Sequence, residues 1–133
     1  MRDLAWSENL SVAVDEIDDD HRRLVDKFNF FSHAVAEKEP PDYLEALLEE
    51  LVAFTAWHFK HEERLMLRYG YDGFAEHKQE HQELIDGVDE IRQEILRSEM
   101  QATDQHIEAL ERWLVEHILV ADMKLGDFLA EAM

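Results

Sequence analysis

The sequence predicts an all-α protein that folds as an up-down-up-down antiparallel four-helix bundle. Four stretches repeat apolar residues at alternating intervals of three and four, which is the spacing of one face of an α-helix. The segments KEPPDY, YGYDGF and RSEMQATD separate these stretches, and the first two contain both prolines and two of the four glycines. Strict alternation of apolar and polar residues, the pattern of a strand, is absent from the sequence. Short connections between successive helices favour antiparallel neighbours, which gives the bundle.

The first two predicted helices cover about residues 18–37 and 42–69, and Asp18 is available as the N-cap of the first. Residues 1–17 precede them as an N-terminal extended arm. One face of the first helix opens on a histidine and continues with apolar side chains: His21, Leu24, Phe28, Phe31 and Val35. The corresponding face of the second helix becomes polar towards its end: Leu44, Leu48, Leu51, Thr55, His58, Glu62 and Leu65.

The last two predicted helices cover about residues 74–99 and 103–132. Two histidines open the apolar face of the third helix: His77, His81, Leu84, Val88, Ile91 and Ile95. In the fourth helix a histidine interrupts the apolar series: Ile107, Leu110, Leu114, His117, Ala121, Leu125 and Phe128. The arm and the four helices form one domain over residues 1–133, because this length and a hydrophobic content of 46 % suit a single core.

The composition excludes several classes of function. The formal net charge is −19, so phosphate backbones and anionic membranes would repel the surface, and nucleic acid is not expected as a partner. No apolar run approaches the ~20 residues of a membrane span, and the start, MRDLAWSENL, lacks the blocks of a signal peptide. We therefore expect a cytoplasmic protein without a membrane span. Cysteine is absent, so any metal must be held by nitrogen and oxygen.

The polar residues of the four helix faces fall at one end of the predicted bundle. They lie near the starts of the first and third helices and in the later parts of the second and fourth, and these places adjoin in an antiparallel bundle. Burying so many polar groups without partners would cost roughly 2 kcal/mol or more each, against a total stability of about 5–15 kcal/mol. Neutral imidazole and ionised carboxylate are donors that divalent iron, zinc or manganese accept. The sequence therefore predicts a metal site with these ligands: His21, His58, Glu62, His77, His81, His117 and Asp122.

The ligand set suits two metals better than one, because its five histidines exceed the four ligands of a tetrahedral ion. If both carboxylates and one solvent oxygen bridge the two ions, the ligand set supplies one donor atom fewer than two octahedral ions need. One position then stays open, on the ion with two histidines, and a small neutral ligand such as dioxygen suits it. Asp122 follows His117 by five residues, which is about 140° around a regular helix. Either the two side chains reach round the helix to the metals, or the helical turn between them is locally widened.

Four motifs resemble the ligand motifs of the hemerythrin family, and in particular of its stand-alone bacterial members: DDDHRRL, HFKHE, HKQEH and HILVAD. The resemblance spans residues 6–128 and implies a non-haem site of two iron ions, bridged by an oxo or hydroxo oxygen, Glu62 and Asp122. It assigns three histidines to one iron and two to the other: His77, His81 and His117, then His21 and His58. It also implies an apolar pocket for dioxygen with these walls: Leu24, Phe59, Trp113, Leu114 and Ile118.

The function implied by the resemblance is reversible dioxygen binding, for storage, delivery or sensing, with an oxygen-consuming protein as an unidentified partner. A di-iron enzyme that acts on peroxide, nitric oxide or oxygen is the alternative. Ferritin-type di-iron oxidases use Glu-x-x-His pairs, and no histidine here has a glutamate three residues before it, which favours binding over turnover. A zinc-stabilised structural bundle is the third hypothesis.

Other polar residues are expected to lie outside the metal site. His61 is interpreted as a solvated histidine among charges, and His33 and His106 as residues of the surface or of the surroundings of the site. The acidic clusters DEIDDD and EEL are interpreted as solvated faces and helix-start charges. Three residues depart from the family pattern without being ligands: Leu125 in place of a common tyrosine, Asp20 in place of glutamine and Asp72 in place of proline.

Overall fold

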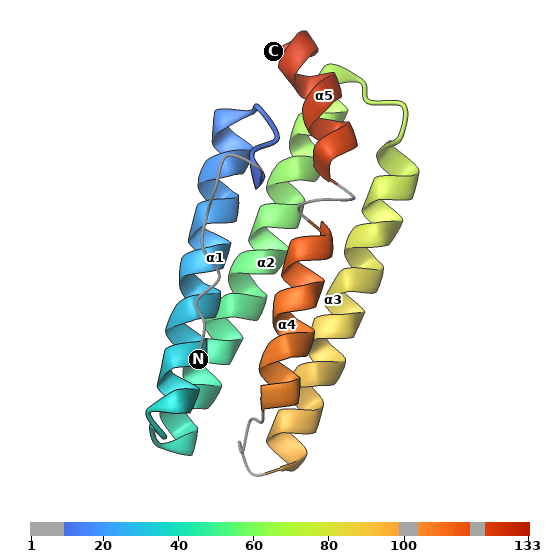
Figure 1. Ribbon diagram of the computed structural model, residues 1–133. Helices are drawn as coiled ribbons and strands as arrows, with labels where there is room; N and C mark the ends of the chain where they lie inside the picture. Colours follow the sequence, from blue (N-terminus) through green and yellow to red (C-terminus); the bar gives the residue numbers. More distant parts are fainter. Residues whose placement is uncertain (1–9, 99–103, 118–121) are drawn as a thin grey trace.

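The computed structural model describes residues 10–98, 104–117 and 122–133, and the regular secondary structure of these residues is entirely helical. Five helices follow one another: α1 (Asp15–Ala36), α2 (Pro41–Tyr69), α3 (Phe74–Arg97), α4 (Asp104–Glu116) and α5 (Asp122–Ala132). Figure 1 shows α1 to α4 side by side with alternating directions, and α5 beyond the end of α4. Both α1 and α3 pack against α2 and α4. The predicted all-α antiparallel bundle is therefore confirmed.

Proline and glycine set the turns between the first three helices. Pro40 precedes α2 and Pro41 occupies its first turn, where the missing N–H costs no helical hydrogen bond. Gly70 ends α2 in the left-handed region with a φ of 71°, and its N–H donates to the carbonyl of Met66. The chain then reverses through residues 70–73 into α3.

The first helix begins at Asp15, and the prediction that Asp18 is its N-cap was wrong. Val14 occupies the N-cap position without a side-chain hydrogen bond. Asp18 instead lies one turn inside α1, where its carboxylate accepts hydrogen bonds from the N–H of Val12 at 2.9 Å and the hydroxyl of Ser11 at 2.6 Å. Val12 and Val14 are buried, so packing of the arm extends the helix beyond the start that the local pattern predicts.

The fourth predicted helix is two helices in the structure, α4 and α5. His117, directly after α4, has π-helical backbone geometry, in keeping with the widened turn that was one of two alternatives for its spacing from Asp122. Residues 99–103, which include the predicted end of the third helix and start of the fourth, and residues 118–121 lie outside the described residues.

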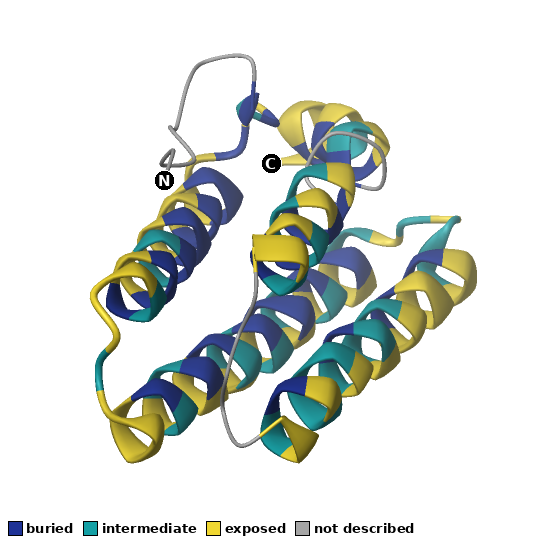
Figure 2. Cartoon of the chain, turned by 60° about the horizontal axis from the view of Figure 1, so that its bottom comes forward, coloured by how far each residue is buried: buried dark blue, intermediate teal, exposed yellow. Residues whose placement is uncertain are grey.

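Two hydrophobic clusters form the core, one on each side of the predicted metal ligands. The larger cluster draws on α1, α2, α3 and α4 and includes Leu24, Phe28, Phe59, Val88, Leu110 and Leu114. The smaller cluster joins the arm and α5 to the adjoining ends of α1 and α2: Val12, Val14, Ile17, Leu65, Met66, Leu125 and Leu129. Figure 2 shows that the buried residues form the inward faces of the helices. The ligand positions therefore occupy a polar layer that apolar side chains cover from both directions.

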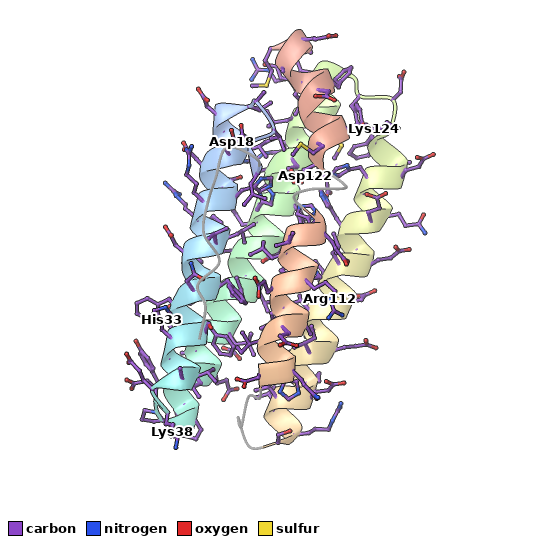
Figure 3. All side chains as sticks on the ribbon, viewed as in Figure 1. Asp18, His33, Lys38, Arg112, Asp122 and Lys124 are labelled. Atoms are coloured by element: carbon purple, nitrogen blue, oxygen red, sulfur yellow. The ribbon has the colours of Figure 1, made fainter. Side chains whose placement is uncertain are left out.

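The surface of the bundle carries the exposed charges. Figure 3 places His33 and Lys38 at the opposite end of the bundle from Asp18 and Asp122. None of the helices in the described part of the chain is long and apolar enough to cross a lipid bilayer.

Candidate metal centre

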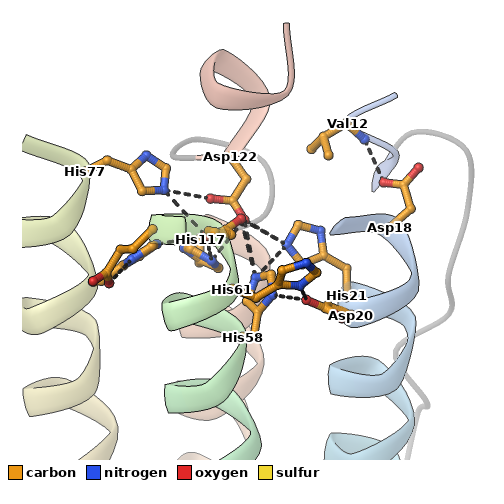
Figure 4. Close-up of polar contacts among 12 residues, drawn as sticks. Val12, Asp18, Asp20, His21, His58, His61, His77, His117 and Asp122 are labelled. Atoms are coloured by element: carbon orange, nitrogen blue, oxygen red, sulfur yellow. Dashed lines mark hydrogen bonds and ion pairs between the residues drawn. The ribbon is translucent and has the colours of Figure 1, made fainter. Parts of the chain in front are cut away.

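The seven predicted ligands meet in one layer, and all seven side chains are buried. They come from every helix of the bundle: His21 from α1, His58 and Glu62 from α2, His77 and His81 from α3, His117 after α4, and Asp122 at the start of α5. Figure 4 shows the rings of His21, His58, His77 and His117 gathered around the carboxylate of Asp122. Their ligand atoms form two groups, each within 4.8 Å: His21, His58, Glu62, His117 and Asp122, and Glu62, His77, His81 and Asp122. Both carboxylates belong to both groups.

Glu62 divides its two oxygens between the groups. Oε1 lies 2.8 Å from His81 Nε2 and 3.6 Å from His77 Nε2. Oε2 lies 3.4 Å from His58 Nε2 and 3.9 Å from His21 Nε2. Each oxygen therefore faces its own pair of imidazoles, which is the arrangement that a carboxylate bridging two metal ions requires.

Asp122 also reaches both sides of the layer. Its Oδ1 lies 3.2 Å from His77 Nε2, and its Oδ2 lies 2.7 Å from His21 Nε2 and 3.0 Å from His117 Nε2. A regular helix would separate positions 117 and 122 by about 140°. His117 has π-helical backbone geometry, and both side chains enter the same layer.

His117 stands between the two groups. Its Nε2 lies 3.0 Å from Asp122 Oδ2 and 3.8 Å from Glu62 Oε1. Proximity alone puts His117 with the ligands of α1 and α2, whereas the family resemblance puts it with the histidines of α3. Its Nε2 is closer to Asp122 Oδ2, which also contacts His21, than to Glu62 Oε1, which faces α3.

Several atoms in the layer converge without hydrogen bonding to one another. Within the described residues, six buried atoms have no hydrogen-bond partner: His21 Nδ1, Glu62 Oε2, His77 Nε2, His117 Nδ1, His117 Nε2 and Asp122 Oδ1. Two of these, His77 Nε2 and Asp122 Oδ1, lie 3.2 Å apart yet lack hydrogen-bond geometry. Imidazole nitrogens and carboxylate oxygens around a shared centre fit divalent first-row metal ions.

The charge of the layer also fits a bound cation. Burial and the charge of Asp122 raise the pKa of Glu62, but the attraction of His58 outweighs both and holds this pKa below its ordinary value. Burial raises the pKa of Asp122 as well, but the attraction of His117 holds it well below its ordinary value. Burial lowers the pKa of His77, whereas its contacts with the carboxylates of Asp122 and Glu62 raise it to about 10. Both carboxylates therefore keep their charge away from water and stabilise positive charge beside them.

Two further carboxylates hold ligand histidines by the ring nitrogen that faces away from the layer. His58 Nδ1 donates to Asp20 Oδ2 at 2.8 Å, and His61 Nδ1 donates to the same oxygen at 2.6 Å. His81 Nδ1 donates to Glu63 Oε2 at 3.0 Å. A carboxylate can only accept, so each Nδ1 carries the hydrogen and Nε2 is left free to bind a metal.

The sequence did not reveal these contacts. Asp18 and Asp20 are buried, so the interpretation of DEIDDD as a solvated cluster was wrong for these two residues. His61 is partly buried against Asp20 and belongs to neither group of ligand atoms, so it is not simply a solvated histidine. Its spacing of three from His58, on a helix that packs against α1, was the available signal. His33 is exposed and His106 is partly buried, as expected of residues outside the site.

Apolar side chains border the layer. Phe59 stacks on His81 with ring centroids 4.0 Å apart and planes 3° apart, and its ring centroid lies 4.7 Å from that of His117. The other described members of the predicted pocket are buried in the larger cluster: Leu24, Trp113 and Leu114. Ile118 lies outside the described residues.

A helical bundle with five buried imidazoles around two shared carboxylates defines a histidine-rich metal-binding protein. The comparison with known families identifies which one. The family model for the hemerythrin HHE cation binding domain matches residues 12–129. The chain belongs to the hemerythrin family, and the predicted resemblance is confirmed.

Relatives and solved structures agree with this assignment. A bacteriohemerythrin of Pseudomonas aeruginosa is 34 % identical over 133 residues, covering 100 % of this chain and 86 % of the relative. A bacteriohemerythrin of Stenotrophomonas maltophilia is 32 % identical over 124 residues, covering 93 % of this chain and 80 % of the relative. The crystal structure of a wild-type hemerythrin superposes with a TM-score of 0.84 at 26 % identity, covering 96 % of this chain and 98 % of the other.

Proposed function

We propose that the chain binds dioxygen reversibly at a pair of non-haem irons. One iron would be held by three histidines and the other by two: His77, His81 and His117, then His21 and His58. Glu62, Asp122 and an oxo or hydroxo oxygen would bridge them. The division of the Glu62 oxygens between two pairs of imidazoles carries this proposal, since a single ion would not need both oxygens turned to different partners.

The iron pair would supply two electrons to dioxygen and recover them on release. The protein contributes the surroundings that make this exchange reversible. The layer lies between two apolar clusters, which exclude water. Phe59, Leu24, Trp113, Leu114 and Ile118 would wall the pocket at the open position of the two-histidine iron. Because the imidazoles are neutral, the two carboxylates and a bridging hydroxide would together offset three of the four positive charges of a divalent pair.

The optical spectrum of the iron-loaded protein tests this function. The protein is loaded with ferrous iron without air and then exposed to alternating air and argon. We expect two irons per chain and visible absorption that appears in air and bleaches under argon over repeated cycles. The variant His33→Ala, altered at an exposed position at the far end of the bundle, should behave like the unaltered chain.

A single iron per chain, or absorption that never bleaches, would refute the proposal. Turnover of peroxide or nitric oxide far faster than autoxidation would favour the enzymatic alternative. A cytoplasmic location and an oxygen-consuming partner protein remain predictions from the sequence.

A further inference from the structure

Each of the two groups of ligand atoms contains one histidine that is held by a carboxylate outside the group. His58 belongs to the group that Glu62 Oε2 faces, and it donates to Asp20 at 2.8 Å. His81 belongs to the group that Glu62 Oε1 faces, and it donates to Glu63 at 3.0 Å. Each group of ligand atoms therefore has one histidine whose Nδ1 is held by a carboxylate from outside that group.

These histidines differ from two other ligands. Within the described residues, Nδ1 of His21 and Nδ1 of His117 have no hydrogen-bond partner. A ring without such a contact can turn about its side-chain bonds and exchange the hydrogen between its two nitrogens. A ring whose Nδ1–H is held by a carboxylate keeps Nε2 directed into the layer, and the carboxylate makes that nitrogen a stronger donor to a metal.

Asp20 is itself held by a second histidine. His61 Nδ1 donates to the same Oδ2 atom at 2.6 Å, so this oxygen accepts from two rings of α2. Asp20 is 4 % exposed and comes from α1, whereas the side chain of His61 is 15 % exposed. His61 therefore contacts the Asp20 carboxylate on its solvent-facing side and restrains its orientation. Glu63 has no second histidine donor among the contacts of the described residues.

We propose that Asp20 and Glu63 are positioning residues, one for each metal, and that His61 fixes Asp20 in place. The inference rests on the proposed pair of metals and adds which residues outside the ligand set prepare each position. Asp20 would act on the metal position of His58, and Glu63 on that of His81. Loss of such a contact typically lowers metal affinity about 10- to 100-fold.

Titration of the metal-free protein with Co²⁺ against a competing chelator tests the inference, because cobalt reports its coordination in the visible spectrum without oxygen chemistry. The variants Asp20→Asn and Glu63→Gln keep the size of each side chain but remove its charge. Each should weaken one of two binding steps by about 10- to 100-fold, and the two variants should weaken different steps. Circular dichroism of the metal-free variants checks that both remain folded.

His61 gives a second test that leaves the buried carboxylate untouched. His61→Ala removes the donor to Asp20 and should weaken the same step as Asp20→Asn. In His61→Asn the amide nitrogen can occupy the place of Nδ1, so this variant should restore the affinity. His33→Ala is the matched control on an exposed histidine and should change neither step.

The outcomes separate the two proposals. If the unaltered chain binds only one Co²⁺, the proposed pair of metals fails. If it binds two but Asp20→Asn and Glu63→Gln weaken the same step, or neither weakens any step, the positioning roles are refuted while the pair stands. Equal losses in His61→Ala and His61→Asn would refute the role of His61.

Discussion

Gly126 of α5 lies against the N-terminal arm, and Gly126→Ala tests how tightly the arm is held. A Cβ atom at this position would clash with the carbonyl oxygen of Val12 and come within 2.6 Å of its Cβ. Contacts this short force one segment to move. Val12 is buried and its N–H donates to Asp18, so the arm cannot withdraw without losing this contact.

The expected loss of stability follows from these contacts. Overpacking of a tight core contact costs about 1–3 kcal/mol, and displacing the arm instead costs about 1.5–3 kcal/mol for a hydrogen bond to a charged group. Alanine is favoured over glycine inside a helix by roughly 1 kcal/mol, which offsets part of either cost. We therefore expect a net loss of up to about 2 kcal/mol, which lowers the melting temperature by up to roughly 8 °C in a domain of this size.

Thermal unfolding followed by circular dichroism measures the effect, with Gly87→Ala as the matched control. Gly87 lies inside α3, and a Cβ there meets no atom within 4 Å. The control should gain roughly 0.5–1 kcal/mol from helix propensity alone. The two substitutions should thus shift the melting temperature in opposite directions at equal metal content. Equal gains in both variants would refute the packing of the arm on α5.

The remaining predictions concern the metal layer and the arm. His117→Ala should lose the proposed metal pair and destabilise the bundle, because buried carboxylates would remain uncompensated. Full iron content by elemental analysis would contradict the assignment. Asp18→Asn should lower stability by about 1–2 kcal/mol through weaker hydrogen bonds to the arm, and an unchanged urea midpoint would count against that contact. Removing metal with a chelator should lower the melting temperature, since a ligand at 100 times its Kd stabilises the folded state by about 2.7 kcal/mol per site.

The ligand layer could be predicted because its pattern is local to each helix. His21, His58 and His81 replace apolar residues at regular helical positions, so periodicity alone assigns them to the inward faces. The antiparallel topology then brings these faces together at one end. The same reasoning could not divide the ligands between two metals, because that division depends on how each oxygen of Glu62 is turned.

The contacts of acidic residues could not be predicted from their own neighbours. Asp18, Asp19 and Asp20 are adjacent in the sequence, yet Asp18 binds the arm, Asp19 is exposed and Asp20 binds His58. Successive positions on a helix point about 100° apart, so one acidic run supplies three different surroundings. Which one is buried depends on the helix and arm that pack there, and charge patterning alone carries no such information.

The energetics of the layer link folding to metal uptake. Four of the buried atoms without a hydrogen-bond partner face the layer, and each costs about 1–3 kcal/mol when nothing satisfies it: Glu62 Oε2, His77 Nε2, His117 Nε2 and Asp122 Oδ1. Together these costs are comparable with the whole stability of a domain, about 5–15 kcal/mol. Protonation of His58 and His77, whose pKa values the carboxylates raise although burial lowers them, supplies some of the positive charge that the layer requires. Metal ions would bind the nitrogen and oxygen donors directly. The arm and α5 would then cover a layer whose polar atoms have partners without water. The fraction of folded chain should therefore depend on free metal concentration, with the apolar clusters on both sides supplying the stability that the empty layer lacks.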